Sequence, residues 1–166
     1  ESLMNKKGFT LIELLIVVAI IGILAAVGAA VIPGLLENAK EKATKSILSQ
    51  TLKYTKTELL RCELGEIKVM ENYLTCKNIK SANGAFNTMQ ALTNIKSLRK
   101  NNIDYGVLKD SKNPFDTTMP ALRSRTNYVP GQISISVTGT VISFKACFKK
   151  GCAADDRSET FINVLD

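Results

Sequence analysis

The polarity of the chain is uneven, with one long apolar run near the N-terminus and mixed sequence after it. From Leu14 to Leu36 there are 23 residues without a charged side chain. A helix rises about 1.5 Å per residue, so this run is long enough to cross a hydrocarbon layer of about 30 Å. The pattern predicts a membrane-spanning helix, with a kink or local melting at Pro33-Gly34.

Beyond this run, apolar residues recur at spacings of mostly three and four, with lysines and glutamates between them. They are Leu36, Ala39, Ala43, Ile47, Leu48, Leu52, Leu59 and Cys62. This spacing predicts an amphipathic helix that continues the apolar one and lays its apolar stripe against a sheet. The charged residues are expected on its solvated face.

Alternation of apolar and polar residues predicts strands near the C-terminus. The run 133–137 alternates, Thr138-Gly139 follows as a turn, and the runs 141–148 and 160–165 give a second and a third strand. The pattern is weaker from Gly65 to Tyr128. There we expect a short helix over 86–98.

Two dipeptides in the same weak region are turn signals, Asn83-Gly84 and Asn113-Pro114. With one long helix and a hairpin, the expected fold class is α+β. A long N-terminal α-helix, apolar in its first half and amphipathic in its second, packs on a small antiparallel β-sheet head of three or four strands. A length of 166 residues suits one such domain with an appended segment.

The amino-acid composition limits the catalytic mechanisms that the chain could use. The chain has no histidine, which removes the commonest general base and the Ser-His and Cys-His nucleophile arrangements. An enzyme with a signal anchor is therefore a distant reading, and no cofactor is expected. The net charge of +7 suits contact with anionic partners, although many basic proteins have none.

The residues before the apolar run set its orientation. Lys6 and Lys7 precede it, which predicts that the N-terminus is cytoplasmic and the rest of the chain is outside. A cleaved signal peptide is disfavoured, because the run exceeds 7 to 15 residues and lacks a small-x-small site. A plain signal anchor does not explain Glu13, a carboxylate about one turn inside the segment, which needs a partner.

The sequence from Lys6 to Ala26 closely resembles the processing site and N-terminal helix of type IV pilins and the related pseudopilins of type II secretion. It joins a basic leader ending in Gly8, an aromatic Phe9, Glu13 at the fifth position after the cut, and a long apolar helix. The resemblance covers about 30 residues. It implies a leader of residues 1–8, a membrane and filament-core helix over 9–36, and a globular head over 37–166.

The same resemblance implies how the segment is used. Prepilin peptidase would cleave between Gly8 and Phe9 on the cytoplasmic side, and the new amine of Phe9 would be N-methylated. Glu13 of one subunit would meet the Phe9 amine of its neighbour during assembly. The expected partners are further copies of the chain, prepilin peptidase, the pilus assembly machinery and, before assembly, the inner membrane.

The four cysteines favour disulfides in a head outside the cytoplasm. Three pairings are possible. Proximity favours Cys62 with Cys76 and Cys147 with Cys152, and the resemblance to pilins, which often close a C-terminal loop, also points to the second pair. A four-cysteine zinc site is disfavoured, because the spacing does not match paired CxxC knuckles.

Two charged groups remain as weak candidates. Asp155, Asp156 and Glu159 could ligate calcium, as secretion pseudopilins can do near their C-terminus, but a solvated acidic loop is the preferred interpretation. DNA binding would rest on dispersed basic and aromatic residues without a motif. These are Arg99, Lys100, Tyr105, Arg123, Arg125, Tyr128, Lys145, Lys149 and Lys150.

The sequence therefore predicts a major type IV pilin that begins in the inner membrane and ends in an extracellular filament, for adhesion, motility or DNA uptake. The alternatives are a type II secretion pseudopilin and a DNA-binding minor pilin of a competence pilus.

Overall fold

The computed structural model describes residues 8–93, 108 and 110–166. The chain divides into two compact units, with the boundary between Asn38 and Ala39. Helix α1 spans Leu11–Glu63 and contains Pro33. Of the two outcomes predicted at Pro33-Gly34, a kink or local melting, melting is wrong, because the hydrogen bonds on either side of a single proline carry the helix through it.

The second unit contains a sheet of four strands in the order β3-β4-β5-β6. The strands are β3 (Leu122–Ser124), β4 (Ile133–Thr138), β5 (Val141–Cys147) and β6 (Arg157–Asn163). β4, β5 and β6 pair antiparallel, whereas the short edge strand β3 pairs parallel to β4. The α+β class and the hairpin at Thr138-Gly139 are confirmed. The third predicted strand begins three residues earlier than expected, at Arg157.

Two small elements follow α1, a hairpin and a helix. The hairpin pairs β1 (Lys68–Val69) with β2 (Leu74–Thr75), and the helix is α2 (Ala82–Thr93). The turn predicted at Asn83-Gly84 is wrong, because these residues lie in the first turn of α2. Ser81 caps this helix by accepting a hydrogen bond from the Gly84 amide at 3.0 Å. A Cβ on Gly84 would lie 1.9 Å from the Ile79 carbonyl oxygen, so only glycine fits here.

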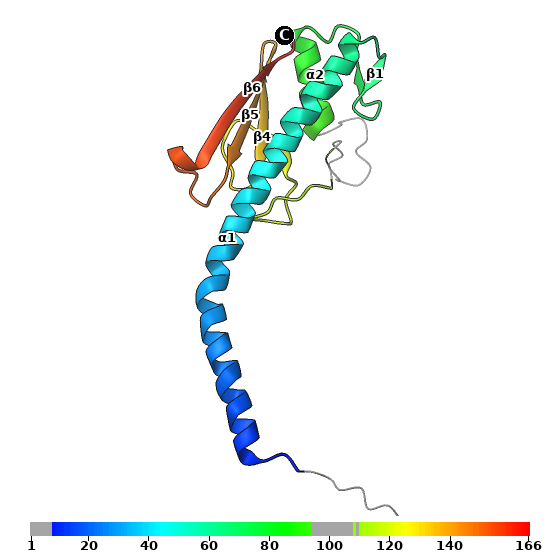
Figure 1. Cartoon of the computed structure of the whole chain (residues 1–166). Helices are drawn as coiled ribbons and strands as arrows, with labels where there is room; N and C mark the ends of the chain where they lie inside the picture. The colour runs from blue at the N-terminus through cyan, green and yellow to red at the C-terminus, as the bar shows by residue number, and fades with distance from the viewer. Residues whose placement is uncertain (1–7, 94–107, 109) are drawn as a thin grey trace, which may run out of the picture. The chain divides into compact units, whose positions relative to one another are not determined.

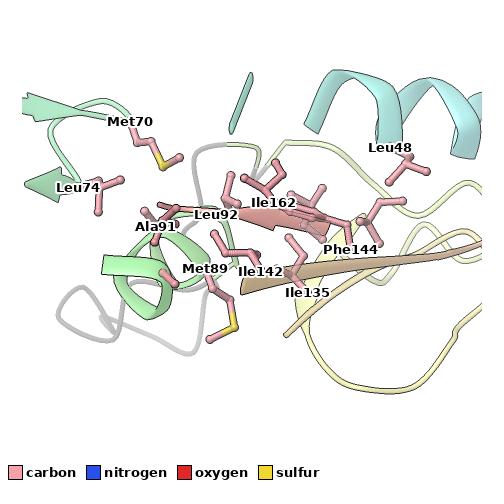
Figure 2. Packing of buried hydrophobic residues seen from close by; sticks show 14 of the residues in the cluster. Leu48, Met70, Leu74, Met89, Ala91, Leu92, Ile135, Ile142, Phe144 and Ile162 are labelled. Atoms are coloured by element: carbon pink, nitrogen blue, oxygen red, sulfur yellow. The ribbon is translucent and has the colours of Figure 1, made fainter. Parts of the chain in front are cut away.

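The core of the head lies between one face of the sheet and the two helices. Figure 1 shows β4, β5 and β6 side by side, with α2 and the C-terminal part of α1 against them. Figure 2 shows the buried side chains that meet there, with Leu48 from α1, Met89 and Leu92 from α2, and Ile135 and Phe144 from the sheet. The core fixes the face of α1 that the head covers.

The buried stripe of α1 differs from the predicted one. Its fully buried positions include three threonines, and it is formed by Thr44, Leu48, Thr51, Thr55 and Glu58. Each threonine hydroxyl donates a hydrogen bond to the carbonyl four residues earlier, at 2.8 to 2.9 Å. The three buried hydroxyls are therefore all paired. Most of the predicted apolar positions flank this stripe and are half-buried, while Leu36 and Ala39 are exposed.

Candidate functional site

Helix α1 begins with a reciprocal cap between Thr10 and Glu13. The Thr10 amide and hydroxyl both donate to Oε2 of Glu13, at 2.8 and 2.7 Å. The Glu13 amide in turn donates to the Thr10 hydroxyl at 3.4 Å. This is the arrangement of a capping box, in which the cap residue and the residue three positions later satisfy each other. Glu13 therefore has local partners within its own chain.

The residues before the cap are open to solvent. Gly8, Phe9 and Thr10 precede the first helical residue and are exposed, and Phe9 exposes 80% of its surface. Nothing in the described chain lies within 4 Å of where a Cβ on Gly8 would stand. The Gly8 to Phe9 peptide bond therefore lies in exposed chain before the helix begins.

The helix surface that follows this bond is apolar and uncovered. Every residue from Leu11 to Leu36 is exposed except Gly28, which is half-buried. α1 is the one helix in the described residues that is long and apolar enough to cross a membrane. Such a surface in water is strongly unfavourable, so it requires lipid or other protein around it.

Comparison with known families agrees with this geometry. The family described as "Prokaryotic N-terminal methylation motif" matches residues 3–29. The chain therefore carries the signature of type IV pilins and prepilin-like proteins at its N-terminus. No curated protein and no solved structure matches the chain significantly.

The structure forms the two local disulfides, Cys62 with Cys76 and Cys147 with Cys152. The first ties the end of α1 to the chain after β2. The second closes a short loop after β5. The described residues contain no free cysteine.

The acidic residues after this loop do not gather into a cation site. Asp156 bonds Lys149 at 2.8 Å, and this contact raises the pKa of the lysine. Glu159 accepts a hydrogen bond from Ser143 at 2.7 Å, away from that pair. No group of three or more potential metal ligands occurs among the described residues. The side chains of Asp155, Asp156 and Glu159 are all exposed or half-exposed. The two with a partner given above, Asp156 and Glu159, bond to Lys149 and Ser143 of the same chain.

The candidate DNA-binding residues separate into groups. Tyr128 lies beside Lys145, and Arg123 lies in the same cross-strand row as Lys145. The two lysines at 149 and 150 belong instead to the disulfide loop. Arg99, Lys100 and Tyr105 lie outside the described residues.

The expectation that the charged residues of this helix lie on its solvated face is wrong for Glu58. Glu58 is almost fully buried, accepts a hydrogen bond from the Met70 amide, and pairs with Arg61 at 2.9 Å. It holds a turn in which Met70, Glu71 and Asn72 all have positive φ, which L residues rarely adopt. Burial, followed by the charge of Glu58, raises the pKa of the neighbouring Tyr54 to about 12.

Sequence reasoning also missed Thr10. The pattern Thr10-Leu11-Ile12-Glu13 is itself the S/T-x-x-E signal of a capping box, so the sequence held the information. For Glu58 the sequence held no comparable signal, because its partner lies twelve residues away through a disulfide-closed loop.

Proposed function

We propose that this chain is the major subunit of a type IV pilus, a structural and non-catalytic protein that polymerises through α1. The observation that carries the proposal is the exposed apolar surface of Leu11 to Leu36, which overlaps the methylation motif at residues 3–29 and continues beyond it. Lipid would cover this surface before assembly, and other copies of the same helix would cover it in the filament.

The precursor would be processed at Gly8. Prepilin peptidase would cut between Gly8 and Phe9, and the new amine of Phe9 would be N-methylated while it stays cationic. The exposure of these residues, and their position before the first helical turn, support this assignment. Residues 1–8 would be the leader, 9–36 the membrane and core helix, and 37–166 the head.

Assembly would then use the new charge. In an apolar environment, the Phe9 ammonium of one subunit and the Glu13 carboxylate of its neighbour would neutralise each other. Removing one partner of a buried ion pair costs about 3 to 5 kcal/mol, because the other charge is left uncompensated. The capping box supports this role, since it fixes the carboxylate at the first turn of α1 before a neighbour arrives.

The route of the protein follows from these steps. The precursor would sit in the inner membrane with its N-terminus inside and its head outside, where both disulfides can persist. The pilus assembly machinery would then move it into an extracellular filament used in adhesion, motility or DNA uptake. A type II secretion pseudopilin shares the N-terminal signature and is the alternative.

Electron microscopy of material sheared from cells, with mass spectrometry of its N-terminus, tests the proposal. Long filaments of this chain that begin at methylated Phe9 are the expected result. Short envelope-bound assemblies would indicate the pseudopilin instead. A chain that keeps residues 1–8 and forms no assembly would overturn both.

A further inference from the structure

The outer face of the sheet, opposite the core, carries a row of polar and charged side chains. The pairing of the four strands places Arg123, Ser134, Lys145 and Glu159 directly opposite one another. Side chains in such a row point to the same face, and each strand lies about 4.8 Å from the next. Within the row Arg123 is exposed, Lys145 is half-buried and Ser134 between them is fully buried, so the two cations lie about 10 Å apart on either side of a covered position.

A tyrosine organises two cations beside this row. Tyr128 has the Lys145 ammonium 5.5 Å and the Arg157 guanidinium 4.9 Å from its ring centroid. Lys145 also donates a hydrogen bond to the Thr126 carbonyl at 3.0 Å. The Tyr128 ring contacts both cations and the Thr126 carbonyl also holds Lys145, so a ligand would meet groups already in place.

Arg125, the residue after β3, adds a further, half-buried guanidinium group. The Arg125 amide donates to the Ile135 carbonyl at 3.0 Å, which continues the pairing with β4 past Ser124. Alternation along the strand then places the Arg125 side chain on the same face as Arg123. Among the described residues, neither arginine forms an ion pair.

The charge of this surface is positive. We call the set Arg123, Arg125, Tyr128, Lys145 and Arg157 the cationic face. The carboxylate beside this face is that of Glu159, which lies 3.6 Å from Lys145 and accepts a hydrogen bond from Ser143. Four cations against one carboxylate leave an excess that attracts a polyanion.

We propose that the cationic face binds the phosphate backbone of nucleic acid without regard to sequence. Three of its four cations are arginines, whose planar guanidinium bonds phosphate oxygens in pairs. The Tyr128 ring already contacts two cations, so we assign it to positioning them and not to stacking on bases. This gives the proposed pilus a partner, but the binding needs only the folded head and does not depend on assembly.

A second basic surface provides the matched control. The stretch 42–57 of α1 holds four lysines and no acidic residue. Lys53 and Lys56 are exposed there and form no ion pair among the described residues. They lie on α1, not on the outer face of the sheet, and no aromatic contact holds them.

The experiment compares two double variants of the full chain in neutral detergent. Binding of two unrelated short DNA duplexes is measured by fluorescence anisotropy over a series of salt concentrations. Arg123→Gln with Arg157→Gln should weaken binding about tenfold and lower the salt slope by about two, equally for both duplexes. Lys53→Gln with Lys56→Gln removes the same charge and should change affinity less than about twofold.

Several results would overturn the proposal. Equal losses in the two variants would mean that only net charge matters, and a loss confined to the lysine variant would move the site to α1. Tighter binding of dextran sulfate than of DNA, with the same dependence on the arginines, would make a sulfated polysaccharide the partner. Circular dichroism checks that each variant is folded, and failure to form filaments would leave the binding result standing.

Discussion

Thr10 and Glu13 bond to each other through both side chain and backbone, with the Thr10 hydroxyl 2.7 Å from the Glu13 carboxylate. The carboxylate satisfies the Thr10 amide, and the Thr10 hydroxyl satisfies the amide of Glu13. A charge that looks unpartnered in the apolar segment is therefore already part of the helix cap. This separates two roles for Glu13, starting the helix and pairing with a neighbouring subunit, and each can be tested.

Replacing the threonine tests the cap. Thr10→Ala removes the hydroxyl and should destabilise the first turn of α1 by about 1 kcal/mol. Hydrogen exchange of the Glu13 and Leu14 amides, measured on the full chain in micelles, should then be about fivefold faster, because a loss of about 1.4 kcal/mol corresponds to a factor of ten. Thr10→Ser keeps the hydroxyl and should leave exchange near the wild-type rate. Equal rates in the two variants would contradict the cap.

Replacing the glutamate tests the pairing. Glu13→Val should still insert into the membrane but should fail to assemble, because the Phe9 ammonium of the neighbour loses its counter-charge. Glu13→Gln can still bond the Thr10 amide and complete a capping box, but it has no charge. Electron microscopy of sheared filaments from both strains distinguishes the roles. Loss of filaments in both variants supports charge pairing. Normal filaments in Glu13→Gln would mean that the helix cap is the only role of Glu13.

The leader boundary is tested at its last residue. Gly8→Val places a branched side chain beside the bond to be cut, in a position where glycine now leaves open space. We expect uncleaved precursor to accumulate in the membrane fraction, detected by mass spectrometry of the N-terminus. Gly22→Ala, a glycine with equally open surroundings farther along α1, is the control and should be processed normally. Mature chain beginning at Phe9 in the Gly8 variant would place the determinant elsewhere.

The sequence predicts the parts of this fold that rest on periodicity. The charge-free run and the alternation around Thr138-Gly139 each report a local structure that neighbours along the chain can stabilise, and both elements form as expected. The stripe on α1 shows where this fails. Thr44, Thr51 and Thr55 count as polar in any hydrophobicity pattern, yet their hydroxyls bond within the helix and they become fully buried.

Contacts between distant segments were less predictable. Gly84 is in a helix although Asn-Gly usually marks a turn, because Ser81 caps that helix and Ile79 packs against the glycine. β3 is too short for alternation to show, and it forms only because β4 offers it an edge. At the functional site the motif residues could be read directly, whereas the surroundings of Glu58 and the Tyr128 contacts depend on how the head folds.

The buried carboxylate of Glu58 should contribute strongly to the stability of the head. Glu58→Ala leaves the Met70 amide buried without a partner, at a cost of about 1 to 3 kcal/mol. Glu63→Ala is the matched control, since its carboxylate pairs with Lys80 at the surface and should contribute less than about 1 kcal/mol. Urea unfolding of the full chain in micelles, followed by circular dichroism, measures both. Equal midpoints would show that the turn at Met70 does not need the carboxylate.

Tyr54, next to this carboxylate, should make the head sensitive to alkaline pH. Burial first, and then the charges of Glu58 and Glu71, raise its pKa from 10.0 to about 12. The folded state therefore keeps the phenol proton more tightly than the unfolded state does. The stability from this difference is complete below about pH 10 and is lost as the pH rises from there through about 12.

Tyr54→Phe removes this proton and should flatten the fall in unfolding free energy between those two pH values, measured by urea titration at several pH values. Tyr73→Phe is the control, because Tyr73 is exposed and its loss should leave the alkaline fall unchanged. A second measurement is the absorbance of phenolate as the pH rises. The last step in this titration should be lost in Tyr54→Phe and kept in Tyr73→Phe. An identical alkaline fall in the two variants would assign it to the lysines, which also lose their protons in this range.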